Sequence, residues 1–233
     1  MWASKLRNAH AGVSVAEEMT AKSHDAQNKA VDELLTRIVQ GSDEVRTEAW
    51  LSAGEIAAPA VKPLAALMTD KELEVGRAAK RGLWKIVRRA GRPGAGQEKK
   101  AVTAELTLLL GQEQPIAVRR EVLWMLSEIG GDESVAPIAA LMSNTELREH
   151  ARMTLERIPG AKSLAALKTA MKNAPKDFKP NLAQSLRQRG VKVRGVGCVK
   201  LVPTKKTNVK PAASKQGTSA GWLNVRTREV REA

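Results

Sequence analysis

Four stretches of this chain repeat one apolar pattern, and this repetition restricts the possible fold more than any other feature of the sequence. Within each stretch, apolar residues return four, eight and eleven positions after the first one. This spacing places them on one face of an α-helix. The four aligned columns are Val45, Val75, Val118 and Leu147; Ala49, Ala79, Val122 and Ala151; Ala53, Leu83, Leu126 and Leu155; and Ile56, Ile86, Ile129 and Ile158.

Each stretch is followed by a second apolar segment. Residues 60–68 read AVKPLAALM and residues 134–142 read SVAPIAALM, and weaker copies follow the other two stretches. Pro63 and Pro137 stand near the start of their segments, where a helix tolerates the missing N–H. The repeating unit is therefore helix, short turn, helix. Because one such unit cannot bury its apolar face alone, the units must stack on one another.

The same reading predicts how the array begins, ends and is interrupted. Residues 28–40 have helical apolar spacing and stop at Gly41, so they predict the second helix of an upstream unit. Residues 178–189 predict a terminal half-unit that ends at Gly190. Residues 88–100, RRAGRPGAGQEKK, predict a basic loop inserted between the two helices of one unit.

Three regions follow from these patterns. We predict an N-terminal cap or extension over residues 1–27, a repeat solenoid over 28–190 and a basic C-terminal tail over 191–233. Within the tail, residues 191–202 alternate loosely in hydropathy, which is typical of a short strand or hairpin. Residues 203–221 are low in hydrophobic side chains, which predicts a partly disordered tail.

The repeat resembles a known family. The pattern V-R-x-x-A, then A or L-x-x-I, then A-V-x-P-L-x-x-L is similar to the HEAT repeat, in its short phycobilisome-lyase HEAT-like form. The resemblance covers about residues 28–190. It implies an all-α fold, a right-handed α-solenoid or superhelix of about four to five helix pairs whose second helices line a concave face. Such repeats mostly serve as binding scaffolds in unrelated pathways, so the resemblance names no reaction.

An arginine recurs directly after the first apolar column. It is Arg46, Arg119 and Arg148 in three of the four units. In the family this arginine usually stacks into a structural ladder with acidic neighbours, and Asp43 or Glu44 is placed to serve that purpose here. We favour this structural role, with ligand binding as the alternative.

The tryptophans of the repeats show no such regularity. Trp50, Trp84 and Trp124 fall in three different columns, so they cannot form one aromatic stripe. This arrangement favours packing between helices over the stacking of nucleic-acid bases.

Little in the composition points to catalysis. The one cysteine, Cys198, excludes an internal disulfide framework and a thiolate zinc site. The glycines of residues 91–96 are not followed by GK[ST], so they are not a P-loop. Aromatic residues make up 3% of the chain and tyrosine is absent, which argues against the aromatic cleft of the HEAT-like DNA alkyl-base glycosylases. The three histidines are widely separated and no His-Glu dipeptide occurs, so we expect neither a metal nor a cofactor.

The net charge of +14 is unevenly distributed. Residues 1–161 contain 22 basic and 22 acidic residues, whereas residues 162–233 contain 17 basic and 3 acidic residues. The last third is therefore expected to contact something acidic, with a merely solvated basic surface as the alternative. The candidate binding residues are Lys168, Lys172, Lys176, Lys179, Arg187, Arg189, Lys205 and Lys206.

Together these patterns predict a non-catalytic scaffold that mediates protein–protein interaction and docks an acidic macromolecular partner. Two alternatives stay open: sequence-independent nucleic-acid binding by phosphate contacts from the basic C-terminal third, and a lyase-type or enzyme-associated HEAT protein. No apolar run reaches the roughly 20 residues that span a bilayer. The N-terminal residues lack the apolar core of a secretory signal, so we expect a cytoplasmic location.

Overall fold

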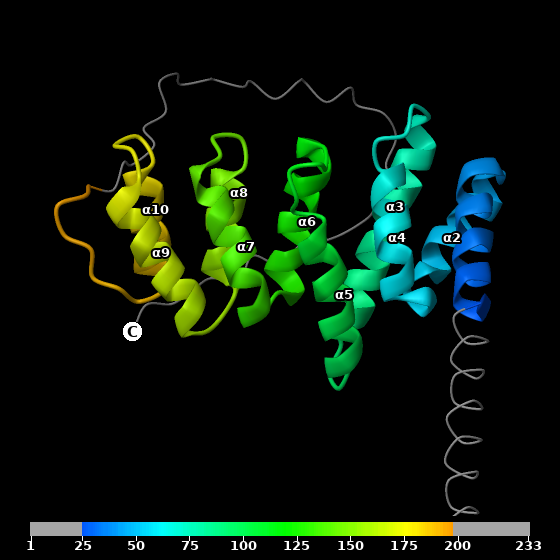
Figure 1. The fold of residues 1–233 in the computed structure, drawn as a ribbon, viewed down its shortest axis with the longest axis horizontal. Coiled ribbons are helices and arrows are strands. Elements are labelled where there is room, and N and C mark those ends of the chain that lie inside the picture. Colours follow the sequence, from blue (N-terminus) through cyan, green and yellow to red (C-terminus); the bar gives the residue numbers. More distant parts are fainter. Residues whose placement is uncertain (1–24, 198–233) are drawn as a thin grey trace, which may run out of the picture. The chain divides into compact units, whose positions relative to one another are not determined.

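The computed structural model describes residues 25–197, and every regular element in that range is helical (Figure 1). The first helix covers residues 25–40. The helices that follow, with short 3₁₀ turns labelled η, are α2 (Asp43–Ile56), η1 (Ala58–Ala60), α3 (Val61–Leu67), α4 (Leu73–Ala90), α5 (Gly96–Leu108), α6 (Ile116–Ile129), η2 (Asp132–Ser134), α7 (Val135–Ala140), η3 (Leu141–Ser143), α8 (Arg148–Arg157), α9 (Ala161–Asn173) and α10 (Lys179–Gln188).

The helices form two layers that follow the order of the chain (Figure 1). In the first layer, α2 packs against α4, α4 against α6, α6 against α8 and α8 against α10. In the second layer, α3 packs against α5, η2 against α5, and α7 against α9. Four helix pairs, α2–α3 to α8–α9, therefore stack in series, with the helix of residues 25–40 before them and α10 after them. This is the all-α solenoid that the repeat predicts.

The repeated apolar columns form the core of the stack. All members of the second and third columns are fully buried. Val118, Leu147 and Ile86 of the other two columns are at most 1% exposed. Only Val45 and Ile56 among the column residues are half-buried, and both belong to the first repeat. The buried side chains of successive repeats join into one cluster, so each helix pair covers the apolar face of its neighbour.

Small residues bring α2 and α4 close together. A Cβ atom on Gly82 would lie 3.4 Å from the Cβ of Ala53 and 3.3 Å from Cδ1 of Leu64. A Cβ atom on Gly54 would lie 3.2 Å from Cδ of Arg89. Neither position has room for a larger side chain unless its neighbours move. The close contact sets the basic surface of α4 beside the side chains of α2.

The predicted inserted loop at residues 88–100 is wrong. Helix α4 continues to Ala90 and α5 begins at Gly96, so only residues 91–95 connect them. The basic residues that end α4 complement the negative end of its helix dipole, and Glu98 lies in the first turn of α5, where an acidic residue is favourable. Arg92 binds Glu98 at 2.7 Å and thereby fixes the short turn, which Gly94 completes with φ of 82°.

The ends of the array differ in part from the expectation. Residues 25–27, which we assigned to the N-terminal cap, belong to the first helix. Residues 191–197 form no strand, and Arg187 of α10 donates hydrogen bonds to the carbonyls of Val193 and Val196. Residues 193–196 are therefore tied to the last helix of the array. The rest of the predicted cap and tail, residues 1–24 and 198–233, lies outside the described residues.

Truncation of a column residue tests whether the columns form the core. Leu126 is fully buried, so Leu126→Ala is expected to lower the free energy of unfolding by about 2–5 kcal/mol. Leu108 on α5 is 70% exposed, so Leu108→Ala should cost less than about 0.5 kcal/mol. Denaturant unfolding measures both values. A cost at Leu126 as small as that at Leu108 would show that the column is not buried.

Candidate functional site

Helix α4 has the most basic surface among the described helices of the first layer. Its sequence, LEVGRAAKRGLWKIVRRA, contains six basic residues and one acidic residue. The repeat pattern assigns Val75, Ala79, Leu83 and Ile86 to the core, so the charged residues occupy the positions that face away from it. Arg77, Lys80, Arg81 and Arg88 are exposed and Lys85 is half-buried. Because its apolar face is buried in the core, α4 carries its positive charge on the outer side.

Two of these cations lie over the indole ring of Trp50 on α2. The guanidinium carbon of Arg81 and the ammonium nitrogen of Lys85 are both 5.7 Å from the ring centroid. A cation at this distance is attracted by the negative face of the ring. The glycine-mediated approach of α2 to α4 brings the ring within reach. Trp50 thus holds two positive charges at the surface without neutralising them.

Trp84, in the middle of α4, is fixed by a hydrogen bond to the next repeat. Its Nε1 donates to Oε1 of Glu121 on α6 at 2.7 Å, while the other oxygen of Glu121 binds Lys80 at 2.6 Å. The guanidinium carbon of Arg88 lies 5.8 Å from the Trp84 ring centroid. One carboxylate therefore neutralises Lys80 and orients Trp84, whereas Arg88 keeps its charge.

The basic residues of α4 divide into two classes by their partners. Arg77 binds Glu74, Lys80 binds Glu121, and Arg89 lies 3.7 Å from Glu98. Within residues 25–197, no carboxylate forms an ion pair with Arg81, Lys85 or Arg88, which we name the α4 cation cluster. These three charges are available to an acidic ligand.

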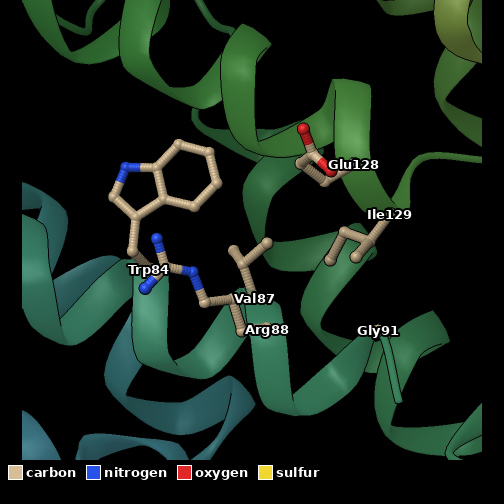
Figure 2. A pocket seen from close by; sticks show the side chains of 6 residues that line it. All are labelled: Trp84, Val87, Arg88, Gly91, Glu128 and Ile129. Carbon is tan, nitrogen blue, oxygen red and sulfur yellow. The ribbon is translucent and has the colours of Figure 1, made fainter. Parts of the chain in front are cut away.

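Two surface hollows flank the cluster. The first, between α2 and α4, has a volume of about 360 Å³ and is lined by Trp50, Arg77, Lys80, Arg81, Trp84, Lys85 and Arg88. The second, between α4 and α6, has a volume of about 500 Å³ and is lined by Trp84, Val87, Arg88, Gly91, Glu128 and Ile129 (Figure 2). Trp84 and Arg88 border both hollows. We name the second one the Ile129 hollow.

The Ile129 hollow combines an apolar base with a charged edge. Val87 of α4 and Ile129 of α6 lie at its base and are almost fully buried (Figure 2). Glu128 at its edge binds Arg157 of α8 at 2.6 Å, so that carboxylate is already neutralised. The net charge around the opening therefore comes from Arg88.

A third hollow lies in the second layer, between α7 and α9. It has a volume of about 670 Å³, and its lining combines five alanines with larger apolar side chains such as Met142 and Phe178 and with several small polar ones. The one arginine that lines it, Arg148, binds Asp177 at 2.6 Å. This groove consequently gives little indication of what chemistry a ligand would need.

The lysines that the sequence singled out are dispersed along the C-terminal end of the repeats. Lys168 and Lys172 are exposed on α9, Lys176 is exposed in the turn that follows, and Lys179 is half-buried at the start of α10. None of them lines any of the three hollows. Lys205 and Lys206 lie outside the described residues. The groove between α7 and α9 lies near them, but its lining includes none of these lysines.

The two arginines of that predicted set have a structural role. Arg189 donates to the carbonyls of Leu155, Ile158 and Gly160 at 3.1, 2.8 and 2.9 Å, and so ties the end of α10 to the turn between α8 and α9. Arg187 binds the carbonyls of residues 193 and 196, as described above. Partner binding by these two arginines stays a prediction, and their guanidinium groups are already engaged by backbone oxygens.

The recurrent arginines of the repeats also have the predicted structural role, with partners that differ from unit to unit. Arg46 binds Asp43 at 2.8 Å and the carbonyl of Ile38 at 2.9 Å. Arg119, only 5% exposed, donates to the carbonyl of Leu110 at 3.0 Å. These contacts satisfy carbonyls that the preceding helix leaves free at its end. The partner of Arg148, Asp177, has a lowered pKa chiefly because of the hydrogen bond between them.

His150 and the acidic side chains give no metal centre among the described residues. No group of three or more His, Cys, Asp or Glu side chains converges between residues 25 and 197. Burial lowers the pKa of His150, and the positive charge of Arg120 acts in the same direction. Within the same residues, no helix has the length and hydropathy that crossing a membrane requires.

Comparison with known proteins finds similarity only at the level of structure. No family model and no curated protein matches the sequence. An engineered protein has 22% identity and a TM-score of 0.37, with 68% of this chain and 78% of that chain covered. A designed armadillo repeat protein has 17% identity and a TM-score of 0.39, with 66% and 80% covered. Another one, in complex with the peptide (KR)4, has 19% identity and a TM-score of 0.38, with 66% and 80% covered.

The assignment of an α-solenoid rests on the serial packing of this chain's own helices. The HEAT-like type remains a resemblance of sequence pattern.

The structural role of Arg189 can be tested by its removal. Arg189→Ala removes the side-chain donor to the carbonyls of Leu155 and Glu156, so we expect the free energy of unfolding to fall by about 1–3 kcal/mol. Arg81→Ala is the matched control: its guanidinium group is exposed and lies over Trp50, and its loss should cost less than about 0.5 kcal/mol. Denaturant unfolding of both variants measures the two free energies. Equal costs would refute the structural assignment of Arg189.

Proposed function

We propose that this protein is a non-catalytic scaffold that docks an acidic segment of a partner protein on the outer surface of α4. The α4 cation cluster carries the proposal, because Arg81, Lys85 and Arg88 have no carboxylate partner within residues 25–197 and stand beside two hollows. Arginine and tryptophan are the residue types that contribute most to binding energy at protein interfaces. A repeat solenoid presents such residues on a surface that its core holds in place.

A protein partner fits this surface better than a nucleic acid does. Arg81 and Lys85 already lie over the ring of Trp50, and Arg88 lies over that of Trp84, so these rings are engaged by the chain's own cations. Stacking of bases on aromatic rings is the usual basis of single-strand binding. The α4–α6 hollow has aliphatic side chains at its base, which suits an amino-acid side chain.

The predicted lysines of α9 and its flanks are a competing site for the same function. Lys168, Lys172 and Lys176 are exposed and form no ion pair within the described part of the chain. They line no hollow, and no aromatic ring lies beneath them among residues 25–197. They therefore serve as the matched comparison for the α4 cation cluster, because reversing three charges changes the net charge equally at both places.

Charge reversal at the two places tests the proposal. The probe is a fluorescent peptide of alternating glutamate and glycine, with its affinity measured by anisotropy. Replacing Arg81, Lys85 and Arg88 together by Glu is expected to weaken binding by about 100-fold at low salt, since three attractive contacts become repulsive. The same replacement at Lys168, Lys172 and Lys176 should weaken it by less than about 5-fold, through the change in net charge alone.

Two results would overturn the proposal. One is an equal or larger loss in the α9 variant, which would place the acidic partner at the C-terminal end of the repeats. The other is tighter binding of labelled single-stranded or duplex DNA than of the peptide by the unaltered protein at the same salt concentration, which would favour the nucleic-acid alternative. Circular dichroism of both variants confirms that the helices are retained.

A further inference from the structure

We infer that the acidic segment carries an apolar side chain next to its carboxylates, and that this side chain enters the Ile129 hollow. The inference rests on the proposed function and specifies what kind of acidic segment the surface selects. Arg88 borders both this hollow and the one beside Trp50. A carboxylate bound by Arg88 therefore places a neighbouring side chain of the same segment at the mouth of the Ile129 hollow.

The hollow has the dimensions and lining of a site for a side chain. Its volume of about 500 Å³ lies within the range of binding sites in proteins. Val87 and Ile129 supply aliphatic contacts at its base, and the ring of Trp84 forms one wall (Figure 2). The ring is kept in this position by its hydrogen bond to Glu121. An apolar side chain would find carbon atoms on several sides there.

The absence of a side chain at residue 91 helps to keep the hollow open. A Cβ atom on Gly91 would lie 3.1 Å from Cγ2 of Ile129. Gly91 has φ of −77°, a conformation that any residue can adopt, so its backbone does not require glycine. A larger side chain at this exposed position would fill part of the hollow, and Ile129 would have to shift slightly to admit its Cβ atom. This position gives a second way to alter the hollow that leaves Trp84 and its hydrogen bond intact.

The charges around the hollow define the rest of the occupant. Glu128 is paired with Arg157 and Glu121 with Lys80, so neither carboxylate adds uncompensated negative charge. The open positive charges are Arg88 at the edge and Arg81 and Lys85 farther along α4. This distribution fits a segment in which glutamate or aspartate residues lie on one side of an aliphatic residue. A purely acidic segment would leave the hollow empty, and a purely apolar one would leave the cations unpaired.

The experiment compares peptides that differ by one side chain. In the glutamate–glycine peptide, a single Leu replaces each Gly in turn. The Leu peptide with the highest affinity is then compared with the peptide that has Ala at the same position. Burying the additional methyl groups should make the Leu peptide bind the unaltered protein about 10-fold more tightly. Trp84→Ala, which removes a wall, and Gly91→Val, which fills the hollow, should each abolish this preference for Leu over Ala.

Trp124→Ala is the matched control for the loss of a tryptophan. Trp124 lies on α6, is 36% exposed and does not line the hollow, so this variant should keep the preference for Leu. Equal affinity of the unaltered protein for the Leu and Ala peptides overturns the inference, and so does a preference that persists in both Trp84→Ala and Gly91→Val. Neither result touches the proposed function, which is tested separately by the charge reversals on α4 and α9 and by the comparison with DNA.

Discussion

The structure depends on one constraint: a pair of short helices cannot bury its own apolar face and must use its neighbours to do so. The repeats whose apolar patterns begin at Val75, Val118 and Leu147 meet this constraint, because their buried side chains join into one continuous core. Each helix of the first layer therefore has one orientation about its axis. Its apolar face is turned towards the second layer and the adjacent repeats. The same constraint determines which residues remain on the outside.

The outer side of α4 illustrates how residues outside the core can vary. The core positions of the helix are satisfied by Val75, Ala79, Leu83 and Ile86, and the residues between them can change without affecting the fold. In α4 those residues are mostly basic, and a tryptophan from α2 and one from α4 itself lie among them. The candidate site is thus an addition to a repeat framework, since the core of the unit needs none of these charges.

The core of the fold could be predicted from the sequence, whereas the candidate site could not. The columns gave the helix faces correctly because burial of apolar surface dominates the energy of a repeat. The sequence analysis did not single out α4, because the charges of residues 1–161 sum to zero. This neutral total concealed Lys80, Trp84 and Arg88, two basic residues and a tryptophan that lie four residues apart on one face of the helix. The four-residue spacing of these residues is a signal that the sequence contains. No sequence pattern, however, indicates that Glu121 would pair with Lys80 and leave Arg88 open, because that choice depends on how α4 and α6 meet.

The arginines show that a basic residue can also serve the fold. Arg187 and Arg189 were predicted as binding residues because they lie in the basic third of the chain, and in the structure the carbonyls of Val193 and Ile158 accept hydrogen bonds from them. A guanidinium group has five donors, and the free carbonyls at helix ends are suitable acceptors. The number of arginines in a repeat protein consequently overstates the charge that is available to a ligand.

The bond from Trp84 to Glu121 has a consequence for recognition. A large aromatic side chain on a surface normally samples several rotamers and loses that freedom when a partner arrives, which weakens the complex. Here the loss takes place when the chain folds, because a carboxylate from the adjacent repeat already restricts the indole. The surface of α4 is accordingly preorganised, and its rigidity originates in the neighbouring repeat instead of in the helix that presents it.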